Sequence, residues 1–168
     1  MKKISMIGAS FLVMIAVATV MFFNACESDP CKDVTCLNGG VCVSGTCDCA
    51  SGYEGTDCST ISRDKFTDTW TVNEDCSSSA PASYIVSITN GSGITDVLIS
   101  NMWDAFVNSV HATVDGNTIS IASQEPDNDG FIVSGQGTIS GTTITWSYTI
   151  DDTLYGTGTD VCTSTWTN

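Results

Sequence analysis

Apolar and polar residues alternate along much of the chain after position 65. In residues 144–150, ITWSYTI, every even position is apolar or aromatic and every odd position carries a hydroxyl group. The same period of two occurs in 84–89, 110–114 and 118–121. Successive side chains of a β-strand point to opposite faces, so this pattern predicts strands with one buried and one solvent-facing side. Because no stretch here keeps a helical period, the region is predicted to be all-β.

Short turn signals separate these runs. Asn90-Gly91, Asp115-Gly116 and Ser140-Gly141 are dipeptides that favour tight turns between antiparallel strands. Counting the runs predicts about eight strands, near 66–75, 83–90, 95–100, 109–115, 117–123, 131–140, 142–150 and 154–167. Eight strands in an antiparallel meander can close into a barrel, which removes the exposed sheet edges.

Two cysteines mark the ends of this predicted domain. Cys76 follows the first strand and Cys162 lies in the last. A disulfide between them requires Cα atoms within about 7 Å, which places the first and last strands side by side, as in a closed barrel. A β-sandwich can also bring its terminal strands together, so it stays as the alternative. We therefore predict an eight-stranded antiparallel meander barrel over residues 66–168.

The chain begins with a targeting segment. Lys2 and Lys3 precede the apolar run 4–23, as in a secretory signal, and an uncleaved membrane anchor is the alternative. Phe23-Asn24-Ala25-Cys26 resembles the lipobox of bacterial lipoproteins. This resemblance implies a signal peptide over 1–25, lipidation of Cys26 and attachment to a membrane through the N-terminal lipid. Residues 26–30 form an acidic tether similar to those that route lipoproteins to the outer face of the outer membrane; a plain solvated linker is the alternative.

Six of the nine cysteines crowd into residues 31–58. Their spacing, with CLNGGVC and CASGYEGTDC segments, resembles the epidermal growth factor (EGF) module. The resemblance implies the disulfides Cys31–Cys42, Cys36–Cys47 and Cys49–Cys58. With Cys26 lipidated, the two cysteines left over are Cys76 and Cys162, so all eight remaining cysteines can pair. A zinc site is disfavoured because exported proteins lie in an oxidising compartment, and the module lacks the calcium-binding pattern of its family, so no metal is expected. Residues 59–65 are expected to be a linker.

Charge excludes some functions. Five Lys and Arg residues stand against 19 Asp and Glu residues, giving a net charge of −14. A chain without a basic patch cannot neutralise phosphates, so nucleic acid is not an expected partner. His111 is the only histidine, which removes histidine-based triads and multi-histidine metal sites. It falls on the solvent-facing side of its strand and is expected to be a surface residue.

The start of the β domain suggests a family. Residues 65–72, KFTDTWTV, resemble the first strand of the lipocalin and fatty-acid-binding (calycin) barrels. The resemblance implies a barrel with a cavity for one apolar ligand. No Lys or Arg follows Lys65, however, so the cationic clamp that holds a fatty-acid carboxylate in that family is not expected here.

Few residues stand out as candidate sites. Trp103 and Phe106 interrupt the strand pattern and could form either an apolar lid over a ligand or a plug that completes the core. Residues 125–130 resemble the start of a calcium loop but lack its distal glutamate, so a solvated loop is favoured. The other large aromatic residues on inward parity are expected in the core, namely Trp70, Trp146, Tyr148 and Trp166.

The acidic residues do not form an obvious catalytic pair. The neighbours Glu74-Asp75 and Asp151-Asp152 point to opposite faces of their strands, so neither pair converges as a glycosidase requires. We expect a non-catalytic, lipid-anchored outer-membrane or surface protein, without a cofactor, that binds a protein, a glycan or a small apolar ligand. The alternative is a hydrolase acting on glycans through carboxylates that converge from different strands.

Overall fold

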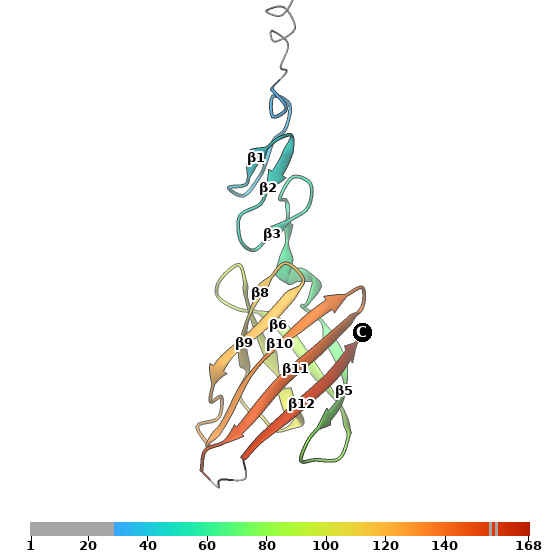
Figure 1. Ribbon diagram of the computed structural model, residues 1–168, viewed down its shortest axis with the longest axis vertical. Coiled ribbons are helices and arrows are strands. Elements are labelled where there is room, and N and C mark those ends of the chain that lie inside the picture. The colour runs from blue at the N-terminus through green and yellow to red at the C-terminus, as the bar shows by residue number, and fades with distance from the viewer. Residues whose placement is uncertain (1–28, 155, 157) are drawn as a thin grey trace, which may run out of the picture.

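The computed structural model describes residues 29–154, 156 and 158–168. Its main body is a closed antiparallel barrel in the order β10-β11-β12-β5-β6-β7-β8-β9 (Figure 1). The strands are β5 (Thr69–Cys76), β6 (Ala82–Asn90), β7 (Asp96–Ser100), β8 (Val110–Asp115), β9 (Thr118–Gln124), β10 (Phe131–Ser140), β11 (Thr143–Asp152) and β12 (Gly158–Thr167). The predicted eight-stranded meander barrel is confirmed, and closure excludes the sandwich.

Closure depends on the pairing of the first and last barrel strands. Cys76 and Cys162 stand directly opposite each other in the β5–β12 register, and a disulfide joins them. The burial of β5 alternates without a break, so Trp70, Val72 and Glu74 point inward with Cys76. The alternation read from the sequence therefore sets which face of each strand lines the interior.

The first barrel strand begins later than predicted. Residues 62–65 form a 3-10 turn, η1 (Ser62–Lys65), and β5 starts only at Thr69. Phe66 is fully buried, and its carbonyl oxygen accepts the indole N–H of Trp70 at 2.8 Å. This turn closes one end of the barrel. The last strand also starts later than expected, at Gly158 rather than at 154.

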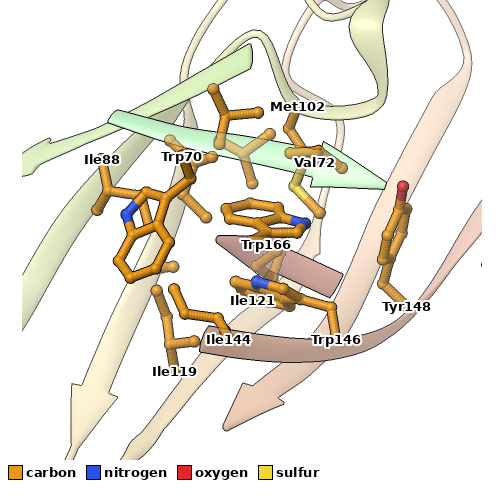
Figure 2. Packing of buried hydrophobic residues seen from close by; sticks show 14 of the residues in the cluster. Trp70, Val72, Ile88, Met102, Ile119, Ile121, Ile144, Trp146, Tyr148 and Trp166 are labelled. Atoms are coloured by element: carbon orange, nitrogen blue, oxygen red, sulfur yellow. The ribbon is translucent and has the colours of Figure 1, made fainter. Parts of the chain in front are cut away.

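Aromatic side chains fill the interior. Trp70, Trp146 and Trp166 are each at most 1% exposed, and the rings of Trp146 and Trp166 lie 5.0 Å apart (Figure 2). The indole N–H of Trp166 donates to the Ser164 hydroxyl at 2.8 Å. Trp70, Trp146, Tyr148 and Trp166 are core residues, as expected, and their rings pack inside the barrel.

Two glycines make room for this packing. Gly137 pairs with Trp146 and Gly135 with Tyr148 across β10 and β11. A Cβ atom at Gly137 would lie 2.7 Å from the Trp146 ring, and one at Gly135 would lie 2.3 Å from Cβ of Tyr148. Only a residue without a side chain lets β10 approach the two aromatic residues this closely.

The cysteine-rich segment precedes the barrel in the chain and stands at one end of it (Figure 1). It holds two small sheets, β1 (Val41–Val43) with β2 (Thr46–Asp48) and β3 (Tyr53–Glu54) with β4 (Thr60–Ile61). Its disulfides are the three pairs that the EGF resemblance implies, Cys31–Cys42, Cys36–Cys47 and Cys49–Cys58. Among the described residues, no helix has the length and hydrophobicity needed to cross a membrane.

Residues 59–65, expected to be a linker, are ordered as β4 and η1. The backbone N–H of Ser62 donates to Gly52 O at 2.9 Å, which extends the pairing of β4 with β3. Arg63 Nη1 donates to three carbonyl oxygens of the β6–β7 turn, those of Gly91, Gly93 and Asp96. Lys65 Nζ donates to Glu54 Oε2 at 2.6 Å and to Asn117 Oδ1 at 2.7 Å. Arg63 and Lys65 therefore both hold the cysteine-rich segment against the barrel.

Candidate functional site

The end of the barrel away from the cysteine-rich segment is called the distal mouth here. It carries the loops that follow β5, β7, β9 and β11, because each of these strands runs away from the segment. The loop after β7 contains η2 (Met102–Asp104), the interruption that the sequence showed. Trp103 and Phe106, the two predicted binding residues, therefore lie at this mouth.

The backbone of this loop is strained. Asn101, Trp103 and Asp104 all have positive φ angles, of 59°, 61° and 49°. The left-handed region is unfavourable for a bulky residue such as tryptophan, at about 1–3 kcal/mol for each such position. Surrounding contacts must hold Trp103 in this conformation.

Hydrogen bonds from three sides provide that support. The backbone N–H of Trp103 donates to the Tyr84 hydroxyl at 3.1 Å. Asn101 Nδ2 donates to Ile85 O at 2.9 Å. On the other side of the loop, Asp127 accepts the backbone N–H groups of residues 107 and 108 at 2.8 and 2.7 Å. Asp127 thus braces the loop, and these bonds lower its pKa.

The loop side chains both plug the core and face the mouth. Met102 is fully buried and Phe106 is 4% exposed, so these two complete the core. Trp103 is half-buried, and its ring centroid lies 5.7 Å from that of Phe106 and 5.5 Å from that of Phe131. The sequence left open whether this segment is a plug that completes the core or a lid over a ligand. Phe106 is part of the core plug, whereas Trp103 lies at the rim of the mouth.

A cavity of about 230 Å³ opens beside Trp103. Its lining combines two aromatic rings with two carboxylates and several smaller groups: Ser78, Trp103, Phe131, Ile150, Asp152, Gly158, Thr159 and Asp160. This volume lies below the range of about 300–1,000 Å³ typical of drug-sized ligands, so the site suits a small molecule.

A buried carboxylate lies close to this mouth, inside the barrel. Glu74 is 7% exposed, and its Oε2 accepts the Tyr84 hydroxyl at 2.6 Å and also the Tyr148 hydroxyl. Burial raises the pKa of Glu74 against the opposing effect of the Tyr84 bond, and the charges of Asp160 and Asp104 raise it further. The same burial and the Glu74 contact raise the pKa of Tyr84. A relay therefore runs from the Trp103 N–H through Tyr84 to Glu74.

A second buried carboxylate lines the cavity itself. Asp160 is 8% exposed, and its Oδ1 accepts the Ser77 hydroxyl at 2.8 Å and the Ser78 N–H at 2.9 Å. Burial works against ionisation, but the bonds from the two serines outweigh it and the pKa of Asp160 lies below its usual value. Asp160 is therefore a negative charge at neutral pH.

One group of potential metal ligands occurs among the described residues, and it does not form a plausible metal site. Ligand atoms of Glu74, Cys76 and Cys162 lie within 4.8 Å of one another, but both sulfur atoms are in the disulfide. Because metals bind cysteine as the thiolate, this group lacks the ligands that it would need.

The other candidate residues are placed as follows. His111 is exposed on the outer wall, where Gln124 pairs with its backbone. Glu74 points inward and Asp75 outward, so this pair does not converge, as expected. Cys26 lies outside the described residues. A larger, open hollow of about 600 Å³ lies on the outer wall over β5, β6, β11 and β12, and half of its lining residues are serine or threonine.

The alternation pattern places two acidic residues on the inward face of their strands, a signal for buried carboxylates that the sequence analysis did not use. Glu74 lies two positions from Val72 and from Cys76, on the inward parity of β5. Asp160 likewise shares the inward parity of Cys162, Ser164 and Trp166 in β12. An acidic residue in an otherwise apolar row is rarely buried without a partner, so each pointed to a polar site.

Comparison with known proteins shows a likeness of the backbone alone. No protein-family model and no curated protein matches this chain. Solved structures with a similar backbone include EF1p2_mFAP2b bound to DFHBI, at 18% identity and a TM-score of 0.48 over 64% of this chain and 96% of that one. Two redesigned β-barrels are also similar: b11L5F_LGL (16%, 0.47, covering 64% and 94%) and mFAP1 bound to DFHBI (20%, 0.44, covering 64% and 98%). The function of this chain must be inferred from its own residues.

Proposed function

We propose that this chain is a lipid-anchored protein of the cell envelope whose barrel binds a small, partly apolar ligand at the distal mouth without catalysis. The observation that carries the binding role is the strained Trp103 loop beside the cavity. Strained backbone persists only where the surroundings enforce it, and it occurs preferentially at functional sites. Three sets of hydrogen bonds hold Trp103 there.

A hydrolase is the less favourable candidate. Glu74 has the raised pKa that a general acid needs, but its Oε2 is occupied by two tyrosine hydroxyls and the residue does not line the distal cavity. A catalytic acid must lie within hydrogen-bond reach of the substrate. Glu74 is better placed to support the loop through Tyr84 than to transfer a proton.

The envelope location rests on the lipobox resemblance at Cys26 and on the acidic residues after it. A lipid on Cys26 would place the cysteine-rich segment between the membrane and the barrel, with the distal mouth facing away from the anchor. Digestion of intact and lysed cells with a protease tests surface display. Cleavage in intact cells supports it, and protection until lysis contradicts it.

Native mass spectrometry of the full chain, purified in mild detergent, tests the binding role. We expect a small molecule to co-purify with the wild-type protein and to be lost from Trp103→Ala. Val107→Ala is the matched control, because Val107 lies in the same loop but is 90% exposed. A wild-type protein without any adduct, or an adduct that Trp103→Ala retains, would contradict a binding site at the distal mouth.

A further inference from the structure

The distal half of the barrel holds two buried carboxyl groups, and no cation among the described residues pairs with either of them. Glu74 and Asp160 are both buried, and the ion pair found among the described residues, Lys65–Glu54, lies at the opposite end of the barrel. Arg63 and Lys65 are the last two basic residues in the sequence apart from His111, and the junction with the cysteine-rich segment uses both. Asp160 is ionised and has hydrogen-bond partners but no cationic partner, so its charge attracts an external cation to this cavity.

Asp160 offers the binding atom. Its Oδ1 accepts the Ser77 hydroxyl and the Ser78 N–H, and these bonds fix the carboxylate in the wall of the cavity. The residue is 8% exposed and belongs to the cavity lining. An ionised carboxylate oxygen facing a small cavity is suited to receive an N–H donor or to lie beside a quaternary ammonium group.

The aromatic residues of the same lining complete the site. The rings of Trp103 and Phe131 have centroids 5.5 Å apart and planes inclined by 55°, so they form a corner rather than a flat stack. The faces of aromatic rings attract cations through their quadrupoles, tryptophan most strongly. The ring corner and Asp160 line one cavity, which combines the two kinds of group that recognise organic ammonium ions.

We infer that the ligand of the distal cavity is a small organic cation, an amine or quaternary ammonium compound whose charged group sits among Trp103, Phe131 and Asp160. This inference rests on the proposed binding function and specifies its ligand class. A compact ammonium ion suits a cavity of about 230 Å³. Carboxylate ligands such as fatty acids are disfavoured, because the site would bring two like charges together.

Three probes of nearly the same shape separate charge from shape: choline, its neutral isostere 3,3-dimethylbutan-1-ol, and the anion 3,3-dimethylbutanoate. The full chain is labelled with 5-fluorotryptophan, which gives one fluorine resonance for each of four tryptophans, and Trp103→Phe identifies the resonance of Trp103. We expect choline to shift that resonance in a saturable way and to bind at least about tenfold more tightly than the alcohol, with no binding of the anion.

Asp160→Asn tests the carboxylate. We expect this variant to lose about tenfold or more in choline affinity while its affinity for the alcohol stays unchanged. Asp115→Asn is the matched control, because it removes the same charge from an exposed position at the opposite end of the barrel. If Asp160→Asn does not fold, the choline-to-alcohol ratio of the wild-type protein decides the question alone.

The outcomes separate the inference from the proposed function. Equal binding of choline and the alcohol at Trp103 would overturn the cation assignment and leave a binding site in place. A response to none of the three probes would also overturn it, while the native mass spectra would still judge the proposed function independently. Choline binding that shifts a different tryptophan and leaves Trp103 unmoved would likewise contradict the assignment.

Discussion

The hydroxyl of Tyr84 accepts the backbone N–H of Trp103 at 3.1 Å and so ties the strained loop at the distal mouth to the barrel wall. The same hydroxyl donates to Glu74 Oε2 at 2.6 Å. A single buried tyrosine therefore links the rim of the cavity to a carboxylate in the interior. Removing the hydroxyl leaves the half-buried Trp103 N–H without its partner and takes one of two tyrosine bonds from Glu74.

Tyr84→Phe should destabilise the fold and loosen the loop. We expect the free energy of unfolding to fall by about 1–3 kcal/mol, the cost of leaving the Trp103 N–H without a partner and of removing one bond from Glu74. Urea denaturation measures it. Ile85→Ala on the same strand is the control, because Ile85 is 60% exposed and its truncation should change stability by much less. Equal stability of Tyr84→Phe and the wild type would show that the relay does not hold the loop.

The pKa of Glu74 makes a prediction about pH. Because burial raises this pKa, the folded chain holds the proton more tightly than the unfolded chain does. The resulting stabilisation is complete below the ordinary value of 4.5 and is lost as the pH rises through the folded pKa. Tyr84, Tyr148, Asp160 and Asp104 are the ionisable groups that act on Glu74.

Glu74→Gln should remove this dependence. Relative to the wild type, the variant is expected to gain stability as the pH rises from 4 to about 8, since glutamine keeps an acceptor for the tyrosines without a charge. Asp75→Asn, on the exposed face of the same strand, is the control and should track the wild type. Urea midpoints across this range provide the measurement. A constant difference between Glu74→Gln and the wild type would mean that Glu74 does not titrate differently on folding.

Gly137→Ala should test the close approach of β10 to the tryptophan core. The added Cβ would meet the Trp146 ring at 2.7 Å and Ile119 at 3.0 Å, so the core must shift. Overpacking of this kind costs about 1–3 kcal/mol. Gln136→Ala, on the exposed face of the neighbouring position, should cost much less in the same urea experiment. An unchanged urea midpoint for Gly137→Ala would show that the core can accommodate the added methyl group, which would contradict the close approach of β10.

Cys26→Ser should release the protein from membranes if that cysteine carries the lipid. Fractionation of cells into soluble and membrane pools measures the effect, and palmitate labelling should disappear in parallel. Ser28→Ala is a neighbouring control that leaves the cysteine intact. Continued tight attachment of Cys26→Ser would instead indicate an uncleaved membrane anchor.

The barrel was predictable because its signals are local and repeated. Alternation assigns each residue of a strand to one face, so the core tryptophans followed directly from the pattern. Cys76 and Cys162 added the one long-range constraint, and the structure places them opposite each other in paired strands. These two kinds of information were enough for the all-β class and a meander of about eight strands, and they favoured closure, but only the structure excludes the sandwich.

The site was less predictable because it depends on contacts between distant segments. Trp103 and Phe106 stood out as an interruption, but their different roles follow from packing against Phe131 and from the positive φ of Trp103. The partners of Glu74 come from β6 and β11, which a parity analysis of β5 alone cannot supply. The order in residues 59–65 was missed for the same reason, because carbonyl groups of the β6–β7 turn hold Arg63.

A crystal structure of the full chain grown with tetramethylarsonium, an anomalously scattering relative of tetramethylammonium, tests the central claim most directly. We expect an arsenic peak in the distal cavity, between the rings of Trp103 and Phe131 and beside the Asp160 carboxylate. A peak confined to the outer wall, or an empty distal cavity at saturating concentration, would contradict the claim that this mouth is a cation-binding site.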